Sequence, residues 1–231
     1  MTRIILPAAL AAVLVGGGFW ALSGAGVDTS AREIALPGAA SAQDDGGNAE
    51  AADVEVQEMT LGAEDAPVEV IEYASFTCPH CASFHETVFD QLKENYIDTG
   101  KVSFTYREVY FDKYGMWASL IARCGGDTDR FFGITDMIYS TQDSWVRADG
   151  EAGIAEELRK IGRLAGIDNT ELESCLTDGD KLRGLVEWYQ ANAEADDVTA
   201  TPTFIIDGEK HSNMNYADFS ALLDEKLDAA E

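Results

Sequence analysis

Basic side chains are scarce in this sequence. Its 231 residues include 16 Lys and Arg against 42 Asp and Glu, which gives a formal net charge of −26. The few basic residues are not clustered. This argues against nucleic-acid binding, because a nucleic-acid-binding domain needs a concentrated basic surface. The acidic excess favours solubility or adaptation to salty surroundings, and by itself it indicates no reaction.

Cysteine and histidine are also few, and their spacing limits the metal sites that the chain can form. Among the four cysteines only Cys78 and Cys81 are close together, whereas Cys124 and Cys175 lie far apart in the sequence. A structural zinc site with four cysteines normally needs a second close pair. One alternative metal site remains, because His85 follows Cys81 by four residues and shares its helix face. Cys78, Cys81 and His85 would then form a three-ligand copper or zinc site.

Residues 1–23 have the features of an export segment. A basic start at Arg3 precedes a charge-free apolar run from Ile4 to Leu22. Small residues after this run would allow cleavage as a signal peptide, and the run is also long enough to serve as an uncleaved N-terminal membrane anchor. In either case we expect the bulk of the chain outside the cytoplasm. Residues 24–53, rich in Ala, Gly and acidic side chains, are expected to form a disordered linker.

The apolar pattern of the remaining residues, 54–231, predicts a folded domain with strands and helices. Alternating or continuous apolar runs predict strands at 54–59, 68–73, 101–109 and 203–206. Helical spacing predicts helical stretches at 79–96, about 113–194 and 216–229. Asp207-Gly208 is typical of a hairpin turn.

The strand at 68–73 leads to Cys78-Pro-His-Cys81, which begins the next helix. A helix N-terminus carries partial positive charge and free N–H groups, so a thiol placed there ionises more readily. Pro79 suits the first helical position, and the ring of His80 would lie beside the first sulfur and favour its thiolate. Two cysteines on one turn can form a disulfide and reopen it. The stretch therefore predicts a thiol–disulfide redox site at Cys78 and Cys81.

A longer pattern carries a family resemblance. It reads Glu72-Tyr-Ala-Ser-Phe-Thr-Cys78-Pro-His-Cys81, continues with Phe84-His85, and is joined far downstream by Thr201-Pro202. These residues resemble the thioredoxin-fold DsbA family of bacterial disulfide oxidoreductases, and the resemblance covers most of 54–231. It implies an α/β, thioredoxin-like fold with an all-helical insertion between the central strands and the strand that a cis-proline opens.

The resemblance also implies roles for individual residues. Cys78 would be the sulfur that a substrate thiolate attacks, and Cys81 its buried partner. Glu72 matches the acid that the family carries six residues before the first cysteine, and it would relay a proton to or from the second thiol. Pro202 would be the cis-proline that sits against the disulfide. Thr201 would offer its backbone to an extended peptide, as a strand-addition contact.

The implied function is a thiol:disulfide oxidoreductase that introduces disulfide bonds into exported proteins in the periplasm, without an organic cofactor. Its implied partners are reduced, unfolded exported proteins and a membrane quinone-linked reoxidase. Thr201 departs from the apolar residue that DsbA has before the cis-proline. A periplasmic reductase or isomerase with a narrow client set therefore remains an alternative, as does a copper-handling module using Cys78, Cys81 and His85.

The other two cysteines, Cys124 and Cys175, fall within the predicted helical insertion. Exported proteins meet an oxidising compartment, which favours a structural disulfide between them. Two separate buried thiols remain the alternative, since free cysteines are often simply part of the core.

Overall fold

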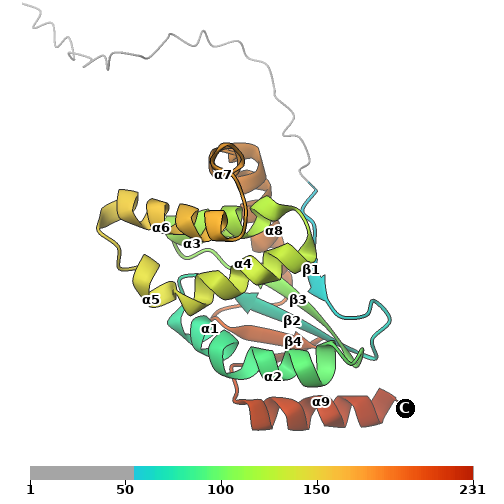
Figure 1. Cartoon of the computed structure of the whole chain (residues 1–231). Helices are drawn as coiled ribbons and strands as arrows, with labels where there is room; N and C mark the ends of the chain where they lie inside the picture. The colour runs from blue at the N-terminus through green and yellow to red at the C-terminus, as the bar shows by residue number, and fades with distance from the viewer. Residues whose placement is uncertain (1–54, 231) are drawn as a thin grey trace, which may run out of the picture. The chain divides into compact units, whose positions relative to one another are not determined.

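The computed structural model describes residues 55–230, so the predicted export segment at 1–23 and the predicted linker at 24–53 lie outside the described residues. In the described part, five strands form one sheet in the order β1-β3-β2-β4-β5 (Figure 1). Strands β2 and β3 are parallel, and the other neighbouring pairs are antiparallel. The strands are β1 (Met59–Leu61), β2 (Val68–Ala74), β3 (Val102–Glu108), β4 (Thr203–Ile206) and β5 (Glu209–Ser212). This mixed sheet with its surrounding helices confirms the predicted α/β fold class.

Strand β2 lies at the centre of the sheet, and its side chains alternate between two buried faces. Val70 belongs to the large core, whereas Ile71 and Tyr73 belong to a smaller core on the opposite face. Because successive side chains in a strand point to opposite faces, Glu72 shares the face of Val70. Burial on both faces explains why the strand is mainly apolar. It also places the Glu72 carboxyl group inside the protein.

One long helix follows Cys78, as the sequence predicts. Cys78 is its N-cap in an extended conformation, and Pro79 takes the first position, where its missing N–H leaves no hydrogen bond unmade. The helix includes two π-helical segments and consists of α1 (Pro79–Phe84), η1 (His85–Phe89), α2 (Asp90–Leu92) and η2 (Lys93–Ile97). Its buried apolar side chains recur every fourth residue, at Phe84, Val88, Leu92 and Tyr96.

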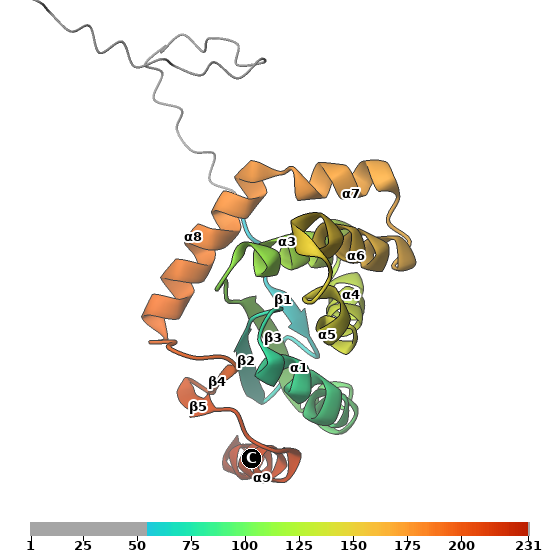
Figure 2. The same ribbon diagram turned by 90° about the vertical axis from the view of Figure 1, so that its left-hand side faces the viewer.

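The predicted all-helical insertion stands between β3 and β4. It comprises α3 (Lys113–Ala122), η3 (Arg123–Gly125), α4 (Thr128–Ser140), α5 (Gln142–Trp145), α6 (Gly150–Leu164), α7 (Asn169–Leu176) and α8 (Gly179–Ala195). Helix α4 packs on α1 and η1, and α3 packs on α4, α6 and α7. Helix α8 leads back toward β4 (Figure 2). Its Tyr189 packs against the smaller core, so the insertion reaches both faces of the sheet.

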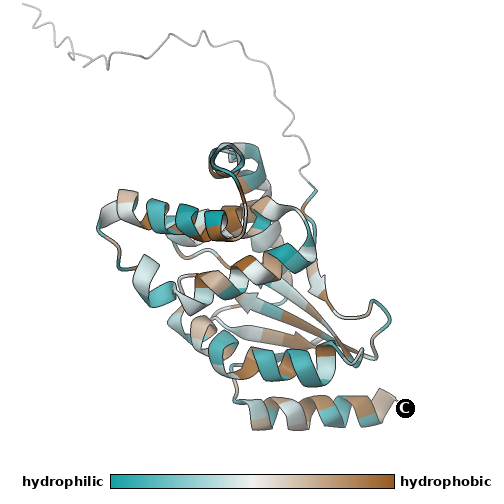
Figure 3. Ribbon diagram, in the orientation of Figure 1, coloured by the Kyte–Doolittle hydropathy of each residue, from teal (hydrophilic) through white to brown (hydrophobic). Residues whose placement is uncertain are grey.

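A hairpin and a last helix complete the domain. Asp207 and Gly208 form the predicted turn between β4 and β5, and both have positive φ, 47° and 79°, which suits a type I′ turn. Helix α9 (Tyr216–Ala230) buries Phe219 and Leu223, and Figure 3 shows hydrophilic and hydrophobic residues alternating along it. No helix between residues 55 and 230 is long and apolar enough to cross a membrane.

The prediction for the first strand was wrong in its position. The sequence predicts residues 54–59, whereas β1 begins at Met59, where pairing with β3 starts. The main-chain carbonyl of Gln57 instead accepts a hydrogen bond of 2.8 Å from Nη1 of Arg123. The alternation of apolar and polar residues along the chain cannot reveal such a tertiary contact. The contact occupies the Gln57 carbonyl, which a longer strand would use for pairing.

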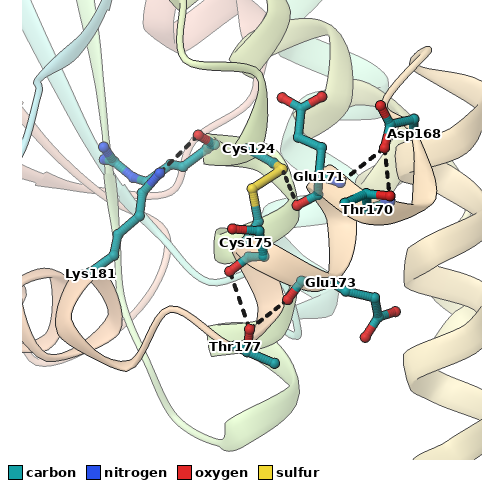
Figure 4. The surroundings of a disulfide bond; sticks show 10 residues. Cys124, Asp168, Thr170, Glu171, Glu173, Cys175, Thr177 and Lys181 are labelled. Carbon is teal, nitrogen blue, oxygen red and sulfur yellow. Dashed lines mark hydrogen bonds between the residues drawn. A yellow bond between two sulfur atoms is a disulfide. The ribbon is translucent and has the colours of Figure 1, made fainter.

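Cys124 of η3 and Cys175 of α7 form a disulfide, with their Cα atoms 5.7 Å apart (Figure 4). The bond joins two helices of the insertion that are distant in sequence. Asp168 fixes the start of α7 beside it, because its Oδ1 accepts hydrogen bonds from the main-chain N–H groups of Thr170 and Glu171. The two cysteines are therefore a bonded pair in this structure and not two separate thiols.

We predict that Cys124→Ala/Cys175→Ala lowers the free energy of unfolding by up to about 4 kcal/mol, because the disulfide closes a loop of 51 residues in the unfolded chain. Urea unfolding without reductant measures the change. The exposed neighbour Ser174 provides a control, since Ser174→Ala should change the value by less than about 0.5 kcal/mol. An unchanged stability in the double variant would show that the bond makes no net contribution.

Candidate active site

The loop between β2 and α1 is held by hydrogen bonds from three directions. The main-chain N–H of Cys78 donates to the carbonyl of Ser75 (3.0 Å). The hydroxyl of Thr77 donates to Oδ2 of Asp112 (2.8 Å), the residue that caps α3. From the insertion, Nε2 of the buried Gln142 donates to the carbonyl of Cys78 (3.0 Å) and to that of the preceding Phe76 (2.8 Å). The position of Cys78 therefore depends on the insertion as well as on the sheet.

Sequence reasoning missed Gln142. A single glutamine in a helical stretch carries no pattern that distinguishes a buried side chain from an exposed one. Only the tertiary structure shows that α5 places its amide group against the loop.

Cys78 and Cys81 are both free thiols in this structure, and they ionise very differently. The pKa of Cys78 is lowered to about 5, chiefly because Cys81 hydrogen-bonds to its sulfur; Thr201 and the main-chain N–H groups of Cys81 and His80 add to the effect, which outweighs partial burial. The pKa of the fully buried Cys81 is raised strongly, first by burial, then by its hydrogen bond to Cys78 and by the charge of Glu72. At neutral pH the pair holds one thiolate and one thiol.

The peptide bond between Thr201 and Pro202 is cis, and it lies next to the first cysteine. Sγ of Cys78 is 3.6 Å from the carbonyl oxygen of Thr201. Pro202 is buried, whereas Thr201 is half-buried. Strand β4 follows directly and pairs with β2, with Thr203 opposite Tyr73, which brings this bend to the end of β2 where the Cys78 loop begins.

His80 lies in the first turn of α1. Its side chain is exposed, and among the described residues it takes part in no hydrogen bond or ion pair. Its main-chain N–H contributes to stabilising the Cys78 thiolate, and a role of its ring stays a prediction.

Glu72 and His85 form a buried pair below the cysteines. Both are almost inaccessible to solvent, and Nε2 of His85 lies 2.9 Å from Oε2 of Glu72. The other carboxyl oxygen, Oε1, is buried without a hydrogen-bond partner in the described structure. The pattern of the sequence indicated both residues but not that they contact each other.

This pairing removes the geometric basis for the three-ligand metal site. His85 is directed at Glu72, and within residues 55–230 no group of three His, Cys, Asp or Glu side chains is arranged to hold a metal ion. The copper-handling alternative that uses Cys78, Cys81 and His85 is therefore not supported by the structure.

Comparison with known proteins agrees with this geometry. Residues 54–225 match the family model described as Thioredoxin. A Rickettsia bellii protein, provisionally named a protein-disulfide oxidoreductase, is 34% identical over 77% of this chain and 68% of its own length. The chain belongs to the DsbA-like thiol:disulfide oxidoreductases.

Two further relatives extend the comparison. The crystal structure of Wolbachia pipientis alpha-DsbA1 superposes with a TM-score of 0.70 at 27% identity and covers 76% of this chain and 94% of that one. Disulfide bond formation protein D of Bacillus subtilis is 25% identical over 70% of this chain and 72% of its own length. The chain spans 62 to 68% of the length of the Rickettsia relatives.

We predict that Cys81→Ala raises the pKa of Cys78 from about 5 by about one to two units, because a hydrogen bond to a charged group contributes about 1.5–3 kcal/mol. Thiolate absorbance in the ultraviolet, followed against pH in reduced protein carrying Cys124→Ala/Cys175→Ala, measures it. Cys81→Ser is the matched control, because its hydroxyl still donates and should keep the midpoint near that of the parent. Equal titration midpoints in the two variants would show that the hydrogen bond from residue 81 does not lower the pKa of Cys78.

Proposed function

We propose that this protein oxidises pairs of thiols in exported proteins and so introduces disulfide bonds into them. The observation that carries the proposal is the unequal ionisation of the two cysteines, with the pKa of Cys78 lowered to about 5 and that of Cys81 raised. A thiolate that is stabilised in the reduced protein favours reduction of the Cys78–Cys81 disulfide. The disulfide form is then an oxidant of other thiols.

The reaction proceeds by two exchanges. A substrate thiolate attacks Sγ of Cys78, which forms a mixed disulfide and breaks the Cys78–Cys81 bond, and the Cys81 sulfur leaves with the electron pair and takes up a proton. A second substrate thiolate attacks the substrate sulfur of the mixed disulfide, and Cys78 leaves as a thiolate. The substrate loses two electrons and gains a disulfide, and the enzyme gains the two electrons.

Other residues of the site support these steps in the proposal. Glu72 supplies the proton to Cys81. Pro79 begins the helix whose N–H groups, including that of His80, face the Cys78 thiolate. Pro202 removes an N–H beside the sulfur and leaves room for an extended substrate. The carbonyl of Thr201, close to Cys78 Sγ, offers that substrate a strand-like hydrogen bond.

The sequence supports a periplasmic setting for this reaction. Residues 1–23 would direct export, either as a cleaved signal or as an anchor in the inner membrane. The reduced enzyme needs an oxidant to start a new cycle, and a membrane quinone-linked reoxidase is the partner that the family implies. Relatives named for disulfide bond formation favour this direction over the reductase or isomerase alternative.

We predict that the oxidised protein converts a reduced peptide with two cysteines to its disulfide form, while Cys78→Ser does not. Cys81→Ser, given the same peptide in its disulfide form, should instead accumulate a mixed disulfide. The Cys78 thiolate attacks the peptide disulfide and one peptide sulfur leaves as a thiolate, but no sulfur at position 81 is present to release the peptide from Cys78. Mass spectrometry of acid-quenched samples separates these products.

A glutathione buffer tests the direction of the reaction. The Cys78–Cys81 pair should remain reduced until oxidised glutathione is a large share of the pool, as expected of an oxidant. A pair that is already oxidised in strongly reducing buffer would contradict the oxidase proposal and favour a reductase.

A further inference from the structure

The reaction leaves one buried group without an assigned task. His85 lies one helical turn after Cys81, on the same side of the helix, and Nε2 of its ring lies 2.9 Å from Oε2 of Glu72. The ring is enclosed by aromatic side chains and stacks on Tyr139 with centroids 4.4 Å apart and planes inclined by 21°. A buried imidazole that faces a buried carboxyl group beside a redox thiol calls for an explanation in terms of proton transfer.

The surroundings leave few ways to stabilise the Glu72 charge. Oε1 has no hydrogen-bond partner, and His85 is the only basic group within ion-pair distance of the carboxyl group in the described part of the chain. A buried carboxylate with a single hydrogen bond is costly. The Glu72–His85 pair becomes neutral overall when it holds one shared proton, either on the carboxyl group or on the imidazole.

The other titratable groups around the pair cannot replace this proton. Cys81 faces it from α1, Tyr106 from β3 and Tyr139 from α4. The two tyrosine hydroxyls hydrogen-bond each other at 2.6 Å, and burial raises the pKa of both well above the usual value. The charge of Glu72 raises the pKa of Cys81, which places the carboxyl group within electrostatic reach of that sulfur.

We propose that His85 is a positioning residue for the exchange reaction, which holds the Glu72 carboxyl group toward Cys81 and shares the proton that Cys81 receives. The proposal rests on the function proposed above. When the Cys78–Cys81 bond breaks, the electron pair goes to Sγ of Cys81 and the shared proton moves from the pair to this sulfur. The Glu72 carboxylate that remains accepts a hydrogen bond from Nε2–H of His85. When the disulfide forms again, the proton returns from Cys81 to the pair.

The test compares His85→Gln with the unaltered full chain. The glutamine amide can still donate to Glu72 but cannot share a proton. We expect reduction of the Cys78–Cys81 disulfide by dithiothreitol to slow at least about tenfold at neutral pH, since a positioned acid typically contributes a factor of about 10² or more. After correction for the thiolate fraction of dithiothreitol, the variant's rate should rise as the pH falls, because solvent protons must now serve Cys81. Thiol labelling after acid quench, read by mass spectrometry at Cys81, follows the reaction.

Two controls separate this role from a structural one. Tyr139→Phe removes a hydroxyl from the ring that stacks on His85 and should keep the rate and pH profile of the unaltered chain. Glu72→Gln/His85→Gln should be no slower than Glu72→Gln alone, because His85 acts through Glu72. Two results would overturn the proposal. One is a His85→Gln protein with lower thermal stability but an unchanged pH profile of the reduction rate. The other is a Glu72→Gln/His85→Gln protein whose loss of rate equals the losses of the two single variants combined.

Nitrogen NMR of the unaltered protein tests the proposal without a substitution. In the reduced form, where the pair has given its proton to Cys81, Nε2 of His85 should carry a hydrogen-bonded proton, and an unprotonated Nε2 would overturn the inference. If dithiothreitol fails to reduce the Cys78–Cys81 disulfide of the unaltered chain, the proposed function fails, which differs from an unchanged rate in the His85 variant.

Discussion

The chemistry of this protein depends on one hydrogen bond, from the buried Cys81 thiol to the Cys78 thiolate. It is the largest single reason why the pKa of Cys78 falls to about 5, and the same bond helps to raise the pKa of Cys81. The bond exists only while the disulfide is open. Whatever holds the two sulfurs in this geometry therefore stabilises the reduced form and makes the disulfide a stronger oxidant.

Several parts of the fold converge on that geometry. Strand β2 brings the loop to the start of α1 and turns Glu72 toward the same interior face. The cis bond before Pro202 places Thr201 beside Cys78. The helical insertion contributes directly, because Gln142 holds the loop carbonyls of Phe76 and Cys78. The insertion is thus part of the active site and not an appended cover.

The sequence predicts much of this arrangement, because local patterns encode it. Apolar runs gave β2 and β4 and helical spacing gave the helix after Cys78, while the strand at 54–59 was misplaced where Arg123 takes a main-chain carbonyl. The cysteine spacing and the family resemblance pointed to Cys78, Cys81 and Pro202. The Glu72–His85 contact and the hydrogen bonds from Gln142 to the loop could not be predicted. They join residues that are brought together only by the packing of separate elements.

The most direct test of the account is the difference in free energy of unfolding between the reduced and oxidised forms, measured in urea on protein with Cys124→Ala/Cys175→Ala. The folded pKa of Cys78, about 5, lies below its ordinary value of 9.0. The thiolate's contribution to stability is therefore present in full above pH 9.0 and lost as the pH falls through about 5. The account predicts a reduced form that is more stable than the oxidised form at neutral pH, with a gap that narrows toward pH 5. An oxidised form that is more stable at neutral pH, with a gap that does not change with pH, would contradict it.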